Sequence, residues 1–326
     1  MIWTVGVAGS TKYTAQVAAA LMADSRFSVK WVLTPNARAV GRHQKVVSNP
    51  LQIWAEEQSV EVLNIDQKID EKLHDELNQK DVVDFLLVLD FGYLVPNWLL
   101  QLPKIKPVNI HPSRLPDWRG SSPGQFTLLS GAEITAVDII EMTPTLDDGP
   151  IIAALPFPVS SSWTQTDYYD HAFQLASEQL AETLAKFADG AITSASQPAL
   201  SPTPLARRLS REDGFIPWAF LLKNLENVSE KDISELAPLT PVENAPLSPL
   251  LSELQPLFKV PWPELIERAR QALSPWPGLW TMIQTPKGQL RVKLLPNNAA
   301  QLEGKTPQTW EELKNQLLGF RTIVSG

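Results

Sequence analysis

Residues 108–124 read VNIHPSRLPDWRGSSPG, and the rest of the chain can be interpreted as a scaffold around them. Asn109 and His111 are two positions apart, so at the end of a strand over 107–110 both side chains would leave the same face. Open α/β sheets bind their ligands at this end of their strands. The prolines and glycines that follow exclude a helix interior and predict an ordered loop. The stretch therefore predicts a site at a strand tip.

Strand and helix patterns alternate around this stretch, up to about residue 200. Residues 3–8 and 27–34 have strand patterns, and residues 14–22 between them carry apolar side chains at helical spacing. Residues 84–89, DFLLVL, are almost continuously apolar, which is typical of a strand buried on both faces. The alternation predicts a Rossmann-like α/β domain with a mostly parallel sheet.

The composition excludes several kinds of site. The chain has no cysteine, which excludes disulfides, a thiolate nucleophile and a cysteine-bound metal. The four histidines lack metal-ligand spacing, and the glycines at 6 and 9 fit neither nucleotide-binding template, so we expect no metal and no nucleotide cofactor. The sequence shows no secretory signal and no apolar run of about 20 residues, so we expect a cytoplasmic protein without a membrane span. A net charge of −8 argues against a general nucleic-acid binder, and we expect a monomer.

The candidate catalytic residues are Asn109, His111 and Asp147. Asp147 lies in the loop TPTLDDG, which follows the next predicted strand, 135–142, so we expect it at a neighbouring strand tip. A histidine near a strand end is more often structural than catalytic when it stands alone. An asparagine can donate to a developing oxyanion, a histidine can move a proton near neutral pH, and a carboxylate can orient the imidazole. Together they predict acyl transfer without a covalent intermediate.

A competing pattern is GSSPG at 120–124, which matches the G-x-S-x-G turn of serine hydrolases. That turn requires a strand directly before the serine and a backbone N–H on the residue after it. Here the predicted strand ends about ten residues earlier and the next residue is Pro123, which has no N–H. We therefore reject a serine nucleophile.

Residues 35–50 are expected to form a long loop that carries Arg38, Arg42 and Lys45 and no acidic residue. Long loops in compact domains are usually functional or disordered. In an acidic domain this cluster is a candidate contact for phosphate groups, and a solvated loop without a ligand is the alternative.

The sequence predicts two domains, 1–204 and 205–326. Residues 238–263 contain seven prolines, so we expect an extended, proline-rich insertion at about 221–262. Beyond it we expect a helix at 264–273, short strands near 280–284 and 289–295, and a last helix at 310–318. The second domain is therefore expected to be a small α+β or barrel-like module.

The motifs resemble a known family. NIHPSRLPDWRGSSP followed by LDDGPII is similar to the formyltransferases that use 10-formyltetrahydrofolate, which carry N-x-H-x-S-L-L-P and a later D-x-G. Within them the resemblance is strongest to the methionyl-tRNA formyltransferases and runs, in order, over nearly the whole chain. The further matching motifs are WRG at 118–120, the basic loop GRHQKVVSNP at 41–50, REDGFIPW at 211–218, PWPG at 275–278 and LEGKTP at 302–307.

The resemblance implies transfer of a formyl group from 10-formyltetrahydrofolate to the amino group of initiator methionyl-tRNA. Asn109 and His111 would stabilise the oxyanion, and Asp147 would set the charge of His111 and assist removal of the amine proton. The resemblance also implies a shortened C-terminal barrel, and Arg38, Arg42 and Lys45 would reach the acceptor end of the tRNA. The residues that would line the folate site are Phe91, Gly92, Ser113, Arg114, Leu115, Pro116 and Asp148.

The chain departs from the family pattern at Asp90, Arg114 and Ala136, none of which removes a catalytic atom. It is also shorter between 295 and 302, where the family has roughly thirty more residues. Two alternatives stay open. The acceptor could be an amino sugar nucleotide, or the chain could be a catalytically silent module that binds folate.

Overall fold

The computed structural model describes residues 2–40, 45–225, 228–241, 246–286 and 288–322. The chain divides into two compact units. The N-terminal unit comprises 1–123, 134–158 and 169–206, and the C-terminal unit comprises 124–133, 159–168 and 207–326.

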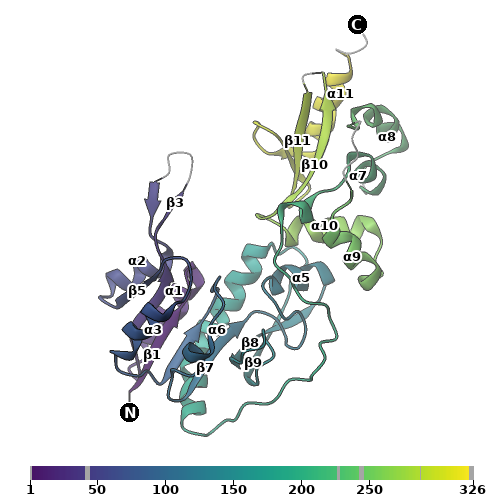
Figure 1. The fold of residues 1–326 in the computed structure, drawn as a ribbon. Coiled ribbons are helices and arrows are strands. Elements are labelled where there is room, and N and C mark those ends of the chain that lie inside the picture. The colour runs from purple at the N-terminus through teal and green to yellow at the C-terminus, as the bar shows by residue number, and fades with distance from the viewer. Residues whose placement is uncertain (1, 41–44, 226–227, 242–245, 287, 323–326) are drawn as a thin grey trace. The chain divides into compact units, whose positions relative to one another are not determined.

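The N-terminal unit contains a seven-stranded sheet of order β5-β2-β1-β6-β7-β8-β9 (Figure 1). The first five strands in this order are parallel, and β8 and β9 run antiparallel to their neighbours. The predicted α/β fold with a mostly parallel sheet is therefore confirmed. The strands are β1 (Trp3–Ala8), β2 (Phe27–Pro35), β5 (Glu61–Ile65), β6 (Phe85–Val88), β7 (Lys106–His111), β8 (Ile134–Glu141) and β9 (Ile151–Pro158).

Both faces of this sheet are buried because the central strands are apolar at successive positions. On one face, Trp31 and Leu33 of β2 and Leu86 and Val88 of β6 pack with Leu73 of α3. The intervening side chains of β2 and β6, which point to the other face, are also buried. The helices up to residue 188 are α1 (Lys12–Ala23), α2 (Pro50–Glu57), α3 (Glu71–Asn78), α4 (Asn97–Leu100), α5 (Pro123–Ser130) and α6 (Gln165–Ala188).

The segment 35–50 is not simply a loop. Arg38–Val40 forms β3 and Lys45–Val47 forms β4, and the two pair as an antiparallel hairpin. Arg42 lies outside the described residues. The expectation of an irregular connection was wrong for the two flanks, whose residues pair from Arg38 with Val47 to Val40 with Lys45, because the β-branched Val46 and Val47 favour an extended backbone.

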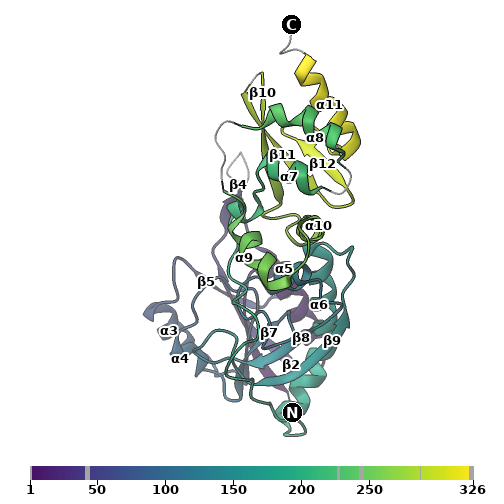
Figure 2. The same ribbon diagram turned by 90° about the vertical axis from the view of Figure 1, so that its right-hand side faces the viewer.

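The C-terminal unit contains a four-stranded antiparallel sheet of order β10-β11-β12-β13 (Figure 2). The predicted strands and helices of the tail are present, and two short strands that the sequence pattern did not reveal complete the sheet. Its elements are η1 (Arg211–Gly214), α7 (Trp218–Asn224), α8 (Glu230–Leu236), η2 (Ala237–Leu239), α9 (Pro249–Phe258), α10 (Trp262–Ala272), β10 (Leu279–Thr285), β11 (Gly288–Leu295), β12 (Ala299–Leu302), β13 (Gln308–Thr309) and α11 (Trp310–Thr322).

The proline-rich segment is largely helical, so the expectation of an extended insertion at 221–262 was wrong. Pro249 is the first residue of α9, and Pro263 lies in the first turn of α10. A proline is tolerated at these positions because a backbone N–H in the first turn has no acceptor within the helix. The Ser248 side chain caps α9 by accepting from the Leu251 N–H. Among the seven prolines of 238–263, all of which the structure describes, only Pro256 lies beyond the first turn of a helix. The number of prolines was a poor predictor, because a proline disrupts a helix only when it lies beyond the first turn.

Candidate active site

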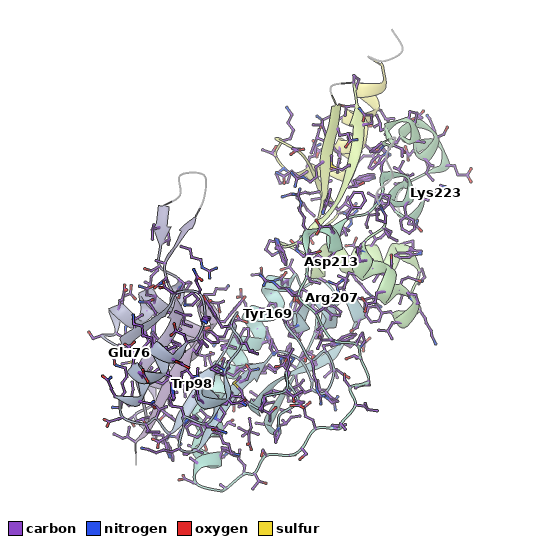
Figure 3. The ribbon with its side chains drawn as sticks, in the orientation of Figure 1. Glu76, Trp98, Tyr169, Arg207, Asp213 and Lys223 are labelled. Carbon is purple, nitrogen blue, oxygen red and sulfur yellow. The ribbon has the colours of Figure 1, made fainter. Side chains whose placement is uncertain are left out.

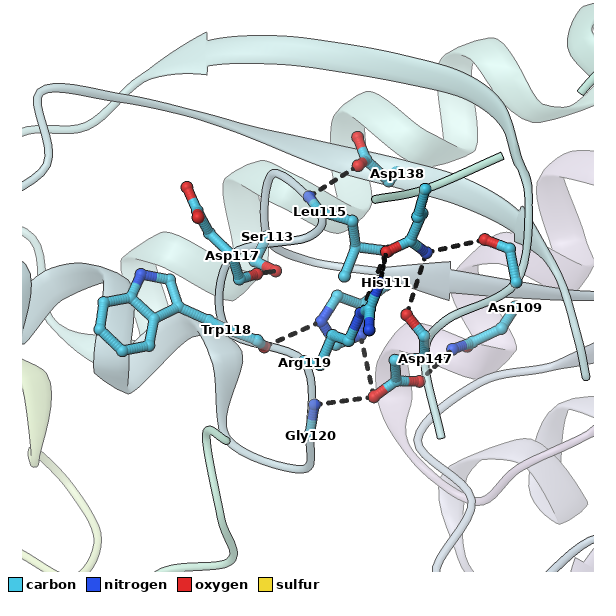
Figure 4. A network of polar contacts seen from close by, with 12 residues as sticks. Asn109, His111, Ser113, Leu115, Asp117, Trp118, Arg119, Gly120, Asp138 and Asp147 are labelled. Atoms are coloured by element: carbon cyan, nitrogen blue, oxygen red, sulfur yellow. Dashed lines mark hydrogen bonds and ion pairs between the residues drawn. The ribbon is translucent and has the colours of Figure 1, made fainter. Parts of the chain in front are cut away.

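Asn109 and His111 lie on β7 and point toward Asp147 (Figure 4). The Asn109 amide nitrogen donates to Oδ1 of Asp147 over 3.4 Å, and Nδ1 of His111 is 3.7 Å from Oδ2 of the same carboxylate. The predicted spacing therefore places both side chains on one face, as two positions along a strand require. Both contacts are longer than an optimal hydrogen bond.

The tautomer of His111 follows from its second contact. Its Nε2 lies 3.1 Å from the backbone carbonyl of Trp118, which can only accept, so Nε2 carries a proton. Nδ1 is then the nitrogen that faces the Asp147 carboxylate. Because His111 is only 3 % exposed, a neighbouring carboxylate is the main compensation that an imidazolium would find here.

Asp147 follows a strand next to β7, as expected, but that strand runs in the opposite direction. Because β8 is antiparallel to β7, its last residue, Glu141, pairs with Val108 near the start of β7, whereas His111 pairs with Asp138. The loop 142–150 then brings the Asp147 carboxylate back to Asn109 and His111. A Cβ at Gly149 would lie 1.8 Å from the Glu141 carbonyl oxygen, so the loop requires glycine there. Asp147 itself has φ of 53°, in the left-handed region.

The loop after β7 supplies the remaining support for Asp147. The Gly120 N–H donates to Oδ2 of Asp147 over 2.8 Å. Gly120 has φ of 122°, and a Cβ there would lie 2.6 Å from the Ala206 carbonyl oxygen, so this position also requires glycine. Ser122 is buried, and Pro123 starts α5 well after β7 has ended. This geometry agrees with the rejection of a serine nucleophile.

Gln197 is a site residue that the sequence did not reveal. Its amide nitrogen donates to the carbonyl oxygens of Asp147, at 3.0 Å, and Gly149, at 2.7 Å. Its amide oxygen accepts from Nε and Nη2 of Arg119, at 3.1 and 2.8 Å. Gln197 therefore ties the loop of Asp147 to the loop after β7. It lies fifty residues from Asp147, in a segment without a motif, so only the fold could show it.

Asp138 is the second such residue. It is paired with His111 across β7 and β8, which places the two side chains on the same face. Its Oδ2 accepts from the Leu115 N–H over 2.9 Å, whereas Oδ1 is buried without a hydrogen-bond partner. Burial raises the pKa of Asp138 to about 7, against the opposing effects of the Leu115 N–H and the Arg114 charge. Asp138 thus changes charge near neutral pH beside the loop of the site.

The residues expected to line a folate site fall into three groups. Ser113 is fully buried, and its hydroxyl donates to the Asp117 carbonyl, so in this structure it stabilises a turn. Leu115 is buried, and Asp148 accepts from the Thr143 hydroxyl. Phe91 and Pro116 are half-buried, and Gly92 and Arg114 are exposed.

The predicted phosphate contacts are only partly described. Arg38 is exposed on β3 and donates to the Tyr93 hydroxyl over 3.2 Å. Lys45 begins β4. Arg38 and Lys45 thus lie on the two strands of one hairpin, and Arg42 is not among the described residues. The structure therefore does not test the predicted cluster.

Two features are absent from the described part of the chain. None of its helices is long and apolar enough to cross a membrane. Among those same residues, no group of three or more histidine or acidic side chains is placed to hold a metal ion.

A comparison with known protein families shows to which family the chain belongs. The model of the family described as formyl transferase matches residues 3–184, more than half of the sequence. The chain belongs to the formyl transferase family. Asn109, His111 and Asp147 all lie within the matched region, as does Asp138, whereas Gln197 lies beyond it.

Solved structures of formyltransferases are similar to this chain at low sequence identity. A sugar N-formyltransferase from a Shewanella species has a TM-score of 0.54 and 14% identity, with 90% of this chain and 97% of that chain covered. Glycinamide ribonucleotide transformylase 1 from Symbiobacterium toebii has a TM-score of 0.50 and 20% identity, covering 60% and 95%. An N-formyltransferase from Helicobacter canadensis, in complex with folinic acid and dTDP-3-aminofucose, has a TM-score of 0.48 and 17% identity, covering 65% and 74%.

Proposed function

We propose that this formyltransferase transfers a formyl group from 10-formyltetrahydrofolate to the amino group of methionyl-tRNA. The observation that supports the chemistry is the convergence of Asn109, His111 and Asp147 on one face of β7. An amide donor, an imidazole and a carboxylate are the groups that amine acylation needs when no enzyme nucleophile takes part.

The reaction balances without a further reagent. The amine nitrogen forms a bond to the formyl carbon, the carbon–nitrogen bond to N10 of the folate breaks, and the proton lost by the amine is matched by the proton gained at N10. The folate supplies an activated formyl group. The protein has to stabilise the oxyanion of the tetrahedral intermediate and to accept the amine proton.

The three side chains divide these tasks among them. The Asn109 amide N–H groups donate to the oxyanion. Asp147 receives the amine proton and stabilises a protonated His111, whose Nδ1 faces it. His111 is held by the Trp118 carbonyl, so its orientation is set before substrate binds.

The proposed acceptor rests on the motifs of the C-terminal unit and on the basic hairpin, with Arg38 exposed on it. A specific observation favours a second acceptor, an amino sugar nucleotide. The sugar N-formyltransferase described above matches 90% of this chain, C-terminal unit included. Its low identity shows the shared fold alone, so the two acceptors have to be separated by experiment.

The test uses the full-length protein with 10-formyltetrahydrofolate and, in separate reactions, methionyl-tRNA, a dTDP-linked amino sugar and glycinamide ribonucleotide. Mass spectrometry of each acceptor measures the gain of one formyl group. We expect formylation of methionyl-tRNA, with unacylated tRNA as the control. Formylation of the sugar alone would replace the proposed acceptor, and the absence of transfer to any amine would favour the silent folate-binding module.

A further inference from the structure

The loop after β7 is hydrogen-bonded to a later segment of the same compact unit, residues 195–206. This segment lies beyond the region that the family model matches. Four backbone groups of the loop pair with it: the Pro116 carbonyl with the Ser201 hydroxyl at 2.8 Å, the Trp118 N–H with the Thr203 hydroxyl at 2.7 Å, the Arg119 carbonyl with the Ala206 N–H at 2.7 Å, and the Ser122 N–H with the Ala206 carbonyl at 3.0 Å. The segment therefore fixes the course of the loop from 116 to 122.

Trp118 is the residue of this loop that acts on His111. Its carbonyl accepts from Nε2 of His111 over 3.1 Å (Figure 4). Its φ is 58°, in the left-handed region, which a bulky residue adopts only at a cost in energy and only where the surrounding structure holds it. The direction of the Trp118 carbonyl, and with it the orientation of the imidazole, thus depends on the contacts that hold this backbone conformation.

Thr203 supplies such a contact at the same residue. Its Oγ1 accepts from the Trp118 N–H over 2.7 Å. This oxygen also lies 3.2 Å from Oγ of Ser201, whose hydroxyl donates to the Pro116 carbonyl over 2.8 Å. Because a hydroxyl donates one proton while its oxygen accepts others, the two hydroxyls can link the Trp118 N–H to the Pro116 carbonyl by successive hydrogen bonds.

We propose that Thr203 is a positioning residue for His111, which it orients through the backbone of Trp118; this role rests on the proposed function of His111 in formyl transfer. The hydroxyl fixes the Trp118 backbone, the Trp118 carbonyl holds the Nε2 proton, and Nδ1 is left facing Asp147. Without the hydroxyl, the Trp118 N–H loses this acceptor and the carbonyl turns away. The proton can then move to Nδ1, where the Asp147 carboxylate attracts it.

The first experiment follows the ring nitrogens of His111 by NMR in the full-length protein, labelled with ¹⁵N at histidine and free of substrate. The chain has four histidines, and His111→Gln assigns the signals of His111 by their disappearance. At a pH where the imidazole is neutral, the two ring signals lie far apart when the proton stays on one nitrogen and approach one another when it is shared. We expect widely separated signals in the wild type and a clear approach in Thr203→Val. Signals of Thr203→Val identical to those of the wild type overturn the proposal.

Three further variants make the test specific to the hydroxyl. Thr203→Ser keeps the acceptor, so its His111 signals should match those of the wild type. Thr203→Ala removes the same hydroxyl and takes the place of Thr203→Val if that variant does not fold. Thr309→Val is the matched control, because the Thr309 hydroxyl accepts from the Glu312 N–H over 3.2 Å in the C-terminal unit. It should unfold at lower urea concentration without a change at His111. Equal changes in Thr203→Ser and Thr203→Val, or a change at His111 in Thr309→Val, would contradict the proposal.

Kinetic measurements with the acceptor that the wild type formylates complete the test. Thr203→Val should lower kcat about tenfold and leave KM for both substrates within about twofold, because a turned imidazole affects the reacting groups more than binding. Thr203→Ser should keep the wild-type kcat, and a wild-type kcat in Thr203→Val would overturn the proposal. A wild type that formylates no amine would reject the proposed function, whereas the substrate-free histidine spectrum would still decide whether Thr203 orients His111. An unchanged spectrum together with normal formyl transfer would reject the role of Thr203 alone.

Discussion

Two regions of the molecule carry sequence motifs of similar strength, yet they are built in opposite ways. Around Asp147, polar side chains approach one another over 3.4 and 3.7 Å, and Asp147 adopts a left-handed backbone. Both regions contain a closely packed glycine, because a Cβ at Gly214 would lie 1.8 Å from the Gly278 carbonyl oxygen and one at Gly149 would lie 1.8 Å from that of Glu141. The difference lies in the polar pairing, which around Gly214 is short and charged. Long polar contacts are typical of a site whose hydrogen bonds tighten when substrate binds, and short ion pairs are typical of a structural junction.

The packing of the second region explains its motifs. Arg207 donates twice to the buried Asp213, at 2.8 and 2.7 Å (Figure 3). Burial alone would raise the pKa of Asp213, but the hydrogen bonds from Arg207 and the Ser210 N–H outweigh it and hold the pKa below its usual value. The motif REDGFIPW therefore joins PWPG, through Gly214 and Gly278, as part of the fold of the C-terminal unit. These motifs identify a domain type and do not by themselves identify an RNA contact.

The largest expected effect is on the rate, from Asp147→Asn. The substitution keeps the shape but removes the charge that faces His111 and the base that takes the amine proton. We expect formyl transfer to fall by roughly two to four orders of magnitude. The free energy of unfolding, measured in urea, should change by about 1 kcal/mol or less, since few packing contacts are lost. Asp170→Asn, at an exposed ion pair with Lys12, is the control. A normal rate in Asp147→Asn would remove the carboxylate from the mechanism.

Gly214→Ala is the opposite case. The added Cβ meets a backbone carbonyl, so the junction has to shift, and we expect a loss of about 3 kcal/mol in the free energy of unfolding. Chemical denaturation measures it, while the kcat of the folded fraction should be retained. Gly319→Ala is the matched control, since nothing lies within 4 Å of its Cβ on α11, and it should stabilise the protein by about 0.5–1 kcal/mol. Equal effects of the two substitutions would show that the contact is not tight.

Asp138→Asn tests how pH acts on the site. The pKa of Asp138 is raised to about 7 in the folded chain, so its contribution to stability is fully present below about pH 4 and is lost as the pH rises through 7. Between pH 5 and 8 the wild type should lose roughly 2–3 kcal/mol relative to Asp138→Asn, which stays neutral. Urea titrations at both pH values measure this difference. Parallel losses in the two proteins would show that Asp138 titrates normally.

The smallest expected effect comes from Gln197, which acts on Asp147 only through the backbone. Gln197→Ala removes its hydrogen bonds to the carbonyl oxygens of Asp147 and Gly149 and should lower kcat about tenfold, with little change in stability. Gln197→Glu keeps an acceptor for Arg119 but sets a carboxylate against those carbonyl oxygens, so it should be at least as damaging. A Glu variant with wild-type kcat would show that the link to Arg119 is the one that matters.

The sequence alone determined the parallel part of the first sheet, two helices and two strands of the tail, and the identity of Asn109, His111 and Asp147 as candidates. These follow from periodicity and local spacing, which a strand or helix converts directly into side-chain direction. The path of the proline-rich segment did not follow, because a proline that begins a helix and one that breaks it look alike in composition.

Only the tertiary structure decided how Asp147 reaches β7, because the antiparallel direction of β8 depends on pairing between distant residues. The same holds for Gln197 and Asp138, whose partners lie 50 and 23 residues away. It holds again for Arg270 and Trp310, because only the elements packed around them bury the Arg270 Nε and the Trp310 indole N–H without a hydrogen-bond partner. A local pattern specifies which way a side chain points along its own element, whereas burial and partners are set by the elements packed against it.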